Sequence, residues 1–591
     1  MVADPRLVAY HKLEGRTDAM SSSGRAGGSG RSPRESIEDK RSLRRSSIAT
    51  VERSVWDDSP RSSIQSFFVA RPQRQSDTPI SWLPAEILCH IFEVLATDMP
   101  PRAPGGALDQ VGSIGWIVVS HVCRHWREIA LSMTTLWAES VGTLVAASET
   151  MLERAQGTPI TLLLNHTHRD ASFHTAHLHL AKALVIDVSE ASYSSNVLYD
   201  VRMGLAMQPL PTLEILSVAH AFGRIPPHNF DLPPINAPSL RRISMENYFL
   251  PWSSSVLTDL SLSRTKMQID GRPSFEEILT LLRNTPTLRR LSLKNWVSET
   301  GGLPEGEHRI SLPFLMRIEI RDRPTQCITL WNALAIPASA HVVLAIDLLG
   351  VAPDTAVSVP NAIFRVLGPH YRVPHAAPFE SLALTDCRGD SFLRIRALVR
   401  DKPRSAVRSP TARLSVDYWP WHSPRGITGF QHVLAAFSLH VGLSHVRALT
   451  LDCAADDDGG DAAALGWRES LEPMTALRVL EVHDRAPPSL LRALGRVDAD
   501  ADEAPVRVDV GRLLLPGLHT LALRPCAHRR RDEARGLAWM ALYNALRQRA
   551  RMNRALRKLQ LFGYFRLEPA TRTRTFQDEL DKVVVEIDWD L

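Results

Sequence analysis

The stretch Leu288-Arg289-Arg290-Leu291-Ser292-Leu293 decides how most of this 591-residue chain folds. Its apolar residues follow the phrase apolar-x-x-apolar-x-apolar, and the closing Leu-x-Leu predicts a short strand whose alternate side chains face one way. Residues 275–286 ahead of it have helical apolar spacing and end in a proline. One copy of the phrase therefore predicts a strand joined to a helix.

The same phrase returns along the chain at a mean step of about 31 residues, with single steps between about 17 and about 41. Clear copies begin at Leu213, Leu240, Leu257, Leu288, Leu315, Phe379, Val446, Leu477, Leu518 and Leu556, and weaker ones at Ala181, Val343 and Thr411. Several copies open with Pro-x-Leu and carry Arg-Arg or Arg-Lys between their apolar anchors. Such a period predicts an α/β solenoid over residues 158–591, because each unit buries its apolar face only by stacking on its neighbours. We expect the least regular part between about 325 and 440.

Two stretches nearer the N-terminus have helical spacing. They are Leu83-Pro84-Ala85-Glu86-Ile87-Leu88-Cys89-His90-Ile91-Phe92 and Val119-Ser120-His121-Val122-Cys123-Arg124-His125-Trp126. The first has a wide apolar stripe that continues to Leu95, and we expect the second to present one stripe from Val119 to Ile129. Two helices of this length cannot bury both stripes in a core of their own. Their surplus apolar surface predicts a partner.

These motifs, followed by the pair Leu136-Trp137, resemble the F-box of fungal F-box proteins, and the C-terminal array is similar to the leucine-rich-repeat-like arm of those proteins. The resemblance implies a small α-helical F-box module over residues 77–140 that docks on the Skp adaptor of a cullin-based (SCF) ubiquitin ligase. A Pro/Gly insertion at about 98–113 interrupts it, and loops lengthen at small entropic cost. The adaptor-binding residues that the motif implies are Leu83, Pro84, Ile87, Leu88, Ile91, Phe92, Val122, Cys123 and Trp126.

The resemblance implies a substrate receptor that holds an unidentified protein client on its repeats and has no catalysis and no cofactor of its own. One alternative is a repeat scaffold that binds proteins without a role in a ubiquitin ligase. The other is an enzyme. Against an enzyme, the sequence has no P-loop lysine and no G-x-S-x-G motif.

Bulk properties narrow the class of partner. The formal charge is +5, and residues 1–76 alone hold about 14 Lys/Arg against about 9 Asp/Glu, so the remainder is close to neutral and gives no reason to expect nucleic acid. The six cysteines are scattered, and the start has no apolar signal region. No run approaches the length of a membrane span. We expect a cytoplasmic or nuclear protein, or one found in both compartments.

The Ser/Arg/Gly-rich residues 1–76 predict a disordered tail, in which Ser46 and Ser47 follow two arginines and form a candidate phosphosite. The histidines at 166, 168, 174, 177 and 179 are the best candidate metal cluster, but their spacing matches no usual zinc module, and we expect no metal. Acidic residues near 456–461 and 498–503 are expected to be solvated insertions, and residues 528–531 an exposed basic loop. We expect Trp252, Trp296, Trp419 and Trp421 to be exposed, and to serve packing rather than to anchor a bound partner.

Overall fold

The computed structural model describes residues 83–103, 112–165, 171–188, 195–220, 233–265, 274–297, 309–374, 376–387, 392–399, 411–419, 426–453, 461–484, 486–495, 513–524, 539–562 and 578–590. The tail with Ser46 and Ser47 lies outside these ranges, as do the insertion residues 104–111. Trp421, the histidines at 166 and 168, the segments 498–503 and 528–531, and most of the acidic run 456–461 also lie outside them.

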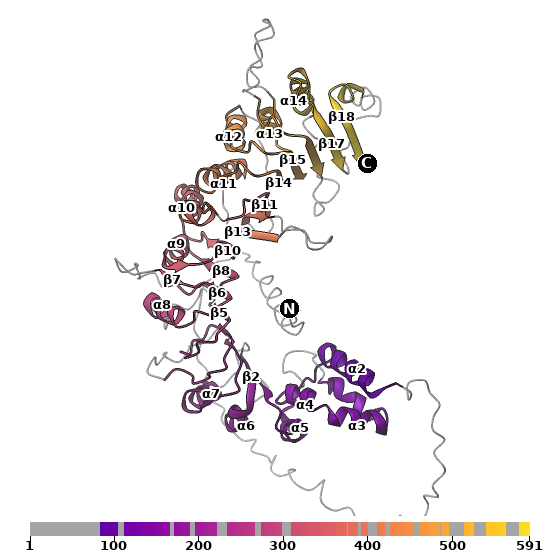
Figure 1. The fold of residues 1–591 in the computed structure, drawn as a ribbon, viewed down its shortest axis with the longest axis vertical. Coiled ribbons are helices and arrows are strands. Elements are labelled where there is room, and N and C mark those ends of the chain that lie inside the picture. The colour runs from indigo at the N-terminus through magenta and orange to yellow at the C-terminus, as the bar shows by residue number, and fades with distance from the viewer. Residues whose placement is uncertain are drawn as a thin grey trace, which may run out of the picture. The chain divides into compact units, whose positions relative to one another are not determined.

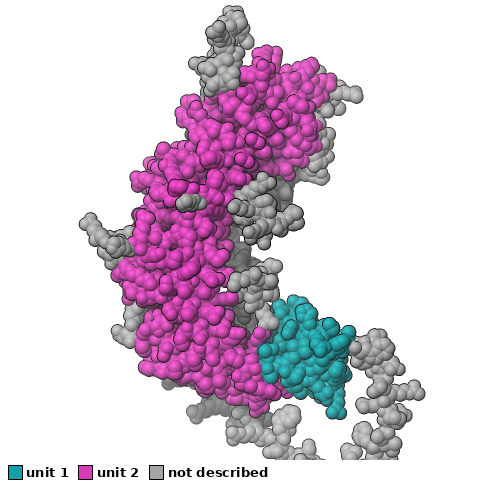
Figure 2. All heavy atoms as spheres, in the orientation of Figure 1, with its two compact units in different colours: residues 1–102, 112–136 teal, residues 103–111, 137–591 magenta. Residues whose placement is uncertain are grey.

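The chain divides into two compact units, drawn in different colours in Figure 2. The first comprises residues 1–102 and 112–136, and the second residues 103–111 and 137–591. The first unit holds α2 (Ala85–Asp98), the 3-10 helix η3 (Gly115–His121) and α3 (Arg124–Ser132). Helix α4 (Thr134–Ser140) begins in the first unit and ends in the second.

The second unit is built on a sheet of 16 described strands in the order β1-β2-β3-β4-β5-β6-β8-β10-β13-β12-β11-β14-β15-β16-β17-β18. Their bounds are β1 (Ile160–Asn165), β2 (Ala181–Val188), β3 (Ile215–His220), β4 (Arg242–Glu246), β5 (Asp259–Ser263), β6 (Arg290–Lys294), β8 (Arg317–Asp322), β10 (His341–Asp347), β11 (Ser381–Cys387), β12 (Phe392–Val399), β13 (Thr411–Trp419), β14 (Ala448–Cys453), β15 (Val479–Asp484), β16 (Thr520–Arg524), β17 (Leu556–Phe562) and β18 (Val584–Asp590). Strands β7 (Ile310–Ser311) and β9 (Leu334–Ala335) form a separate pair.

Helices connect most of these strands, and α8 to α12 follow one another along one side of the strands (Figure 1). The helices of the second unit are η4 (Val145–Ala147), α5 (Ser148–Ala155), α6 (Ser172–His177), η5 (Leu178–Leu180), α7 (Ser195–Met207), α8 (Phe275–Arg283), α9 (Pro324–Ala333), α10 (Pro353–Tyr371), α11 (Gly426–His440), α12 (Asp461–Leu471), α13 (Pro488–Ala493) and α14 (Trp539–Arg551). Among the described helices, none has the length and apolar character that a membrane crossing needs.

The predicted α/β class, a helical module followed by parallel strands and helices, is confirmed, and every copy of the phrase leads into a strand. One copy was placed in the wrong register. We expected Val343 to be an inward anchor, but Val342 pairs with the buried Ile318 of β8, and Val342, Leu344 and Ile346 are the buried apolar residues of β10. The apolar run Val342-Val343-Leu344 fits both registers, so the sequence alone does not choose between them.

The sheet changes its order where we expected the least regularity. Strand β12 lies antiparallel between β11 and β13, so that β10 pairs with β13 and β11 pairs with β14. The side chain of Arg394 on β12 donates two hydrogen bonds to the carboxylate of Asp417 on β13, both at 2.7 Å. The inserted strand is thus joined to its neighbour by main-chain pairing and by a two-point ion pair.

The recurring Pro-x-Leu has a structural role, because the middle residue carries a hydroxyl that bonds to the preceding repeat. Thr212 Oγ1 donates to the carbonyl of Ala181 at 2.9 Å, and Thr287 Oγ1 donates to the carbonyl of Leu257 at 2.9 Å. Ser239 Oγ likewise donates to the carbonyl of Pro211 in the repeat before it, at 2.7 Å. These contacts join consecutive turns of the array at the point where each strand is about to begin.

A buried asparagine links the ends of three neighbouring strands. Asn247, after β4, donates from Nδ2 to the carbonyl of His220 at 2.9 Å, and its Oδ1 accepts from the backbone N–H of Thr265 at 2.7 Å and from the Thr265 hydroxyl at 2.9 Å. Its backbone is left-handed, with φ of 52°. Asparagine tolerates that conformation better than most residues do.

We predict that Asn247→Ala lowers the free energy of unfolding by about 2 to 3 kcal/mol, because it leaves buried groups unpaired and puts alanine in a left-handed conformation. Asn553→Ala is the matched control, since Asn553 has φ of 57° but an exposed side chain. It is expected to cost less than about 1 kcal/mol. Urea denaturation followed by circular dichroism measures both, and equal losses would show that the hydrogen bonds of Asn247 contribute nothing.

Helices α9 and α10 pack around a histidine that is kept neutral. The ring of His370 lies edge-on to Trp331, with centroids 5.3 Å apart, and to Tyr371, with centroids 4.8 Å apart. Burial, and after it the nearby charge of Arg413, lowers the pKa of His370 to about 4. The unfolded chain, with an ordinary histidine pKa near 6.5, therefore binds a proton at a higher pH than the folded chain does.

The folded protein is consequently expected to lose stability as the pH falls from about 6.5 to about 4, and His370→Phe should reduce this loss by about 1 to 2 kcal/mol after allowance for solvent screening of the part-exposed ring. The test compares the free energy of unfolding of both proteins at pH 7 and pH 4.5. Other titrating groups contribute equally to the two proteins. Parallel pH profiles would contradict the assignment.

Candidate protein-docking face

Helix α2 begins directly after the proline of the first motif. Pro84 is its N-cap, the main-chain N–H of Leu88 donates to the Pro84 carbonyl at 3.2 Å, and Glu86 lies in the first turn. Proline has no N–H to leave unpaired at this position, and an acidic residue in the first turn interacts favourably with the helix dipole. The motif thus fixes where the helix starts and which faces its residues occupy.

The wide apolar stripe of α2 is in fact two adjacent faces. Leu88 and Phe92 are fully buried in the interior. Ile87, 49% exposed, and Val94, 48% exposed, lie on the other face with the half-buried Ile91. Apart from Val94, the motif implied all of these residues for the adaptor contact, which stays a prediction, but Leu88 and Phe92 are covered by this chain itself. They support the helix from inside, and the side chains open to a partner are one position away along the chain.

The interior of the module is aromatic. Phe92 of α2 packs against the half-buried Trp126 of α3, with ring centroids 5.3 Å apart and planes at 59°. Trp116 of η3 is also buried, and the sequence reasoning missed it. The apolar run Gly115-Trp116-Ile117-Val118-Val119 directly after the insertion was the signal that would have found it. Aromatic pairs of this kind add stability beyond the area they bury.

The second motif is not one helix, and the single stripe expected from Val119 to Ile129 is wrong. The 3-10 helix ends at His121, Cys123 is extended with φ of −156°, and α3 starts at Arg124. The sulfur of Cys123 caps α3 by accepting from the N–H of Trp126 at 3.5 Å. Because the backbone changes direction here, Val122 is 59% exposed and does not join the interior.

Polar contacts hold this turn. The side chain of Arg127 donates from Nε to the carbonyl of Ser120 at 2.8 Å, and the hydroxyl of Ser120 donates to the carbonyl of Ile117 at 2.8 Å. Arg127 is exposed, and its side chain also satisfies a carbonyl at the end of the 3-10 helix.

The insertion is closed at its base by main-chain bonds. Arg102 and Ser113 exchange two N–H···O bonds of 2.8 and 2.9 Å. Gly115 has φ of +58°, and a Cβ at this position would lie 2.3 Å from the carbonyl oxygen of Met99. Only glycine allows the chain to pass this close, so the two ends of the insertion are held together at its base.

The remaining motif positions lie at or near the surface of the unit. Pro84 and Cys123 are exposed, and Leu83 is half-buried. The exposed apolar set of the unit is Ile87, Val94, Met99, Ile114, Val118 and Val122, each between 45% and 59% exposed. These side chains are available for contact with another protein, and apolar side chains that lie together on a surface mark such contacts.

Other candidates from the sequence have structural roles in the second unit. His174 is buried and its Nε2 lies 3.0 Å from the carbonyl of Leu163, and His177 Nδ1 lies 2.8 Å from the carbonyl of Phe173. Within the described ranges no group of three or more His, Cys, Asp or Glu side chains could hold a metal.

The tryptophans divide into two kinds. Trp252 and Trp296 were expected to be exposed, but both are buried. Phe249 packs on both of their rings, with centroids 6.1 and 5.7 Å away. Trp419 on β13 is 37% exposed and remains open to contact.

Comparison with protein families agrees with the geometry. A family model described as F-box-like matches residues 80–141, and no curated protein matches the chain. The matched range contains every residue that the motif implied for adaptor binding. The chain therefore carries an F-box-like domain, which indicates a role in protein–protein interaction, and F-box domains typically bind Skp-type adaptors.

The two faces of α2 predict different effects of truncation. Phe92→Ala is expected to lower the free energy of unfolding of the module by about 3 to 4 kcal/mol, because it leaves a cavity beside Trp126. Ile87→Ala, on the same helix but half-exposed, should cost less than about 1 kcal/mol. Hydrogen exchange of the α2 amides measures both. A larger loss from Ile87→Ala would mean that Ile87 belongs to the interior.

Proposed function

We propose that this protein is the substrate-recognition subunit of an SCF-type ubiquitin ligase. Its F-box-like domain binds a Skp adaptor, and through the adaptor a cullin, and its leucine-rich-repeat-like sheet binds a protein client. The single observation that carries the proposal is the exposed apolar set on α2, η3 and the turn after it, within a domain whose family typically binds such adaptors.

The exposed set supports a docking role because the interior of the module is already complete without it. Leu88, Phe92 and Trp116 fill the core, while Ile87 and Val122 remain open. Covering an aliphatic side chain of this size with a partner is worth about 1 to 2 kcal/mol. Several such side chains together supply enough free energy for a specific complex, which none of them does alone.

Under this proposal the chain has no catalysis and no cofactor of its own. It binds the client and the ligase at the same time, and the raised effective concentration of the client near the transfer enzyme accelerates the reaction. The proposal places the protein in the cytoplasm, the nucleus or both. It also assigns the phosphosite at Ser46 and Ser47 to regulation, since a phosphate there would reduce the positive charge of the tail.

Co-expression with a Skp adaptor tests the proposal. Ile87→Glu/Val122→Glu is expected to reduce adaptor recovery at least about tenfold, because it would bury two unpaired charges at the contact. Met540→Glu/Val585→Glu is the matched control, since these apolar side chains are 65% and 78% exposed in the second unit. It should leave recovery unchanged. Equal recovery with both double variants would contradict the proposal and favour the scaffold without a ligase role.

A further inference from the structure

The Arg-Arg and Arg-Lys pairs between the anchors of the phrase place cations on the open face of the sheet. In the register of β4, β5, β6 and β8, Arg242 pairs with Asp259, Asp259 with Arg290 and Arg290 with Arg317. Four residues further along β6 and β8, Lys294 pairs with Arg321. We call the cations of these strands the basic face: Arg242, Arg290, Lys294, Arg317 and Arg321.

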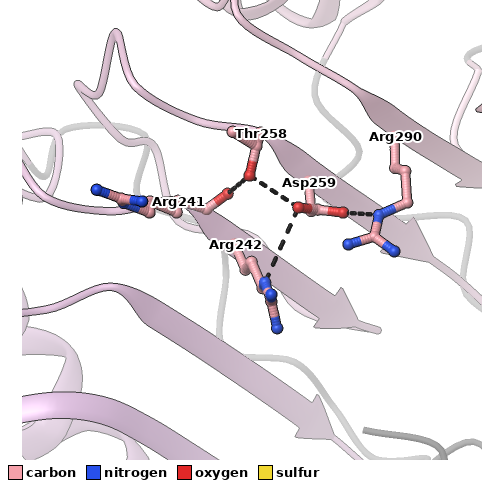
Figure 3. A network of polar contacts seen from close by, with 5 residues as sticks. All are labelled: Arg241, Arg242, Thr258, Asp259 and Arg290. Atoms are coloured by element: carbon pink, nitrogen blue, oxygen red, sulfur yellow. Dashed lines mark hydrogen bonds and ion pairs between the residues drawn. The ribbon is translucent and has the colours of Figure 1, made fainter. Parts of the chain in front are cut away.

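Two carboxylates are shared among these cations. Asp259 contacts Nε of Arg290 and lies 3.9 Å from Nε of Arg242, and its Oδ2 accepts from Thr258 at 2.8 Å (Figure 3). Glu319 lies 3.4 Å from Lys294 and 3.6 Å from Arg317. Each carboxylate therefore compensates only part of the charge of its two cations.

The face keeps an excess of positive charge. On the open face of these four strands, five cations stand against Asp259, Glu319 and Glu246, which leaves a formal excess of two positive charges. Asp322 at the end of β8 is buried on the other face and is not counted. The carbonyl of Arg241 accepts from Thr258, but the Arg241 side chain turns away from the network in Figure 3 and is not counted. On the next strand, burial and then the charge of Arg317 lower the pKa of His341, which therefore adds no charge near neutral pH.

Two of the cations, Arg290 and Arg317, are also open to a ligand. The side chains of Arg290 and Arg317 are 59% and 50% exposed, and among the described residues Arg290 uses only its Nε. A guanidinium has five N–H donors in a planar fork that matches a carboxylate, so four donors of Arg290 remain for a ligand. Arg321 lies over the ring of Trp419, 5.7 Å from its centroid, and this exposed tryptophan offers an apolar contact beside the cations.

We propose that the basic face binds an Asp/Glu-rich, extended segment of the protein client. The inference rests on the proposed role of the sheet in client binding. The four strands span about 14 Å at their usual spacing, which equals four to five residues of an extended peptide. A peptide can present carboxylates opposite the arginines and small neutral residues opposite Asp259 and Glu319. The evenly spaced phosphates of a nucleic acid meet both carboxylates and are repelled, and so short a face offers few phosphate contacts.

The experiment measures fluorescence anisotropy of the full-length protein with two labelled ten-residue probes, one of alternating Glu and Ser and one of alternating Gln and Ser. We expect the Glu probe to bind, with an affinity that falls as salt rises, and the Gln probe not to bind. Arg290→Gln/Arg317→Gln should weaken the Glu probe about tenfold. These substitutions leave Arg242 beside Asp259 and Lys294 beside Glu319, so no carboxylate loses all of its partners.

Arg478→Gln/Arg557→Gln is the matched control, since both arginines are exposed on other repeats of the sheet. It should bind the Glu probe like the unaltered protein. The inference is overturned if the two double variants bind equally, if the Gln probe binds as well as the Glu probe, or if a phosphoserine probe or a single-stranded oligonucleotide binds more than tenfold tighter than the Glu probe.

Adaptor recovery, measured on the same proteins, separates the two proposals. Arg290→Gln/Arg317→Gln should leave adaptor recovery unchanged, and Ile87→Glu/Val122→Glu should leave binding of the Glu probe unchanged. Loss of adaptor recovery alone therefore reports on the F-box-like domain, and loss of peptide binding alone reports on the basic face.

Discussion

Each strand of the second unit buries its apolar side chains only because another strand lies beside it. The main chain enforces this arrangement along much of the sheet, since the carbonyl just before several strands accepts two N–H bonds from the next repeat. The carbonyl of Thr258 accepts from Arg289 and Arg290 at 2.7 and 2.9 Å, and the carbonyl of Arg447 accepts from Arg478 and Val479 in the same way. Stability in such an array is a sum of contacts between neighbours, and interruption of one contact divides the array.

The same constraint creates the open face. Parallel strands in register bring residues from distant parts of the chain to about 5 Å from one another, so Arg242, Arg290 and Arg317 form one row although about 75 residues separate the first from the last. Alternation then puts Leu260 and Leu262 inside and leaves Asp259 and Ser261 outside. The hydrophobic effect decides which face is buried, and the residues left outside determine which ligand chemistry that surface attracts.

The two surfaces of this protein use different physics. The F-box-like domain presents apolar side chains over a completed aromatic core, and such a surface is suited to a lasting contact whose strength comes from the area it buries. The basic face presents partly compensated cations, and such a surface is suited to contacts that form fast and weaken with salt. The proposed function, a receptor that keeps its ligase and exchanges its clients, needs this combination.

The sequence by itself determined the α/β class and the position of the helical module and of the strands that carry a copy of the phrase, because each depends on a local period of apolar residues. It also placed the F-box-like motif, since each of its two parts, residues 83–92 and residues 119–126, is one continuous stretch of sequence. It did not determine the register of β10, where two readings of Val342-Val343-Leu344 are equally apolar, or the antiparallel β12. Nor did it show that Leu88 and Phe92 are inside while Ile87 is outside. Those assignments depend on which residues from elsewhere in the chain cover each side chain, and only the tertiary structure brings those residues together.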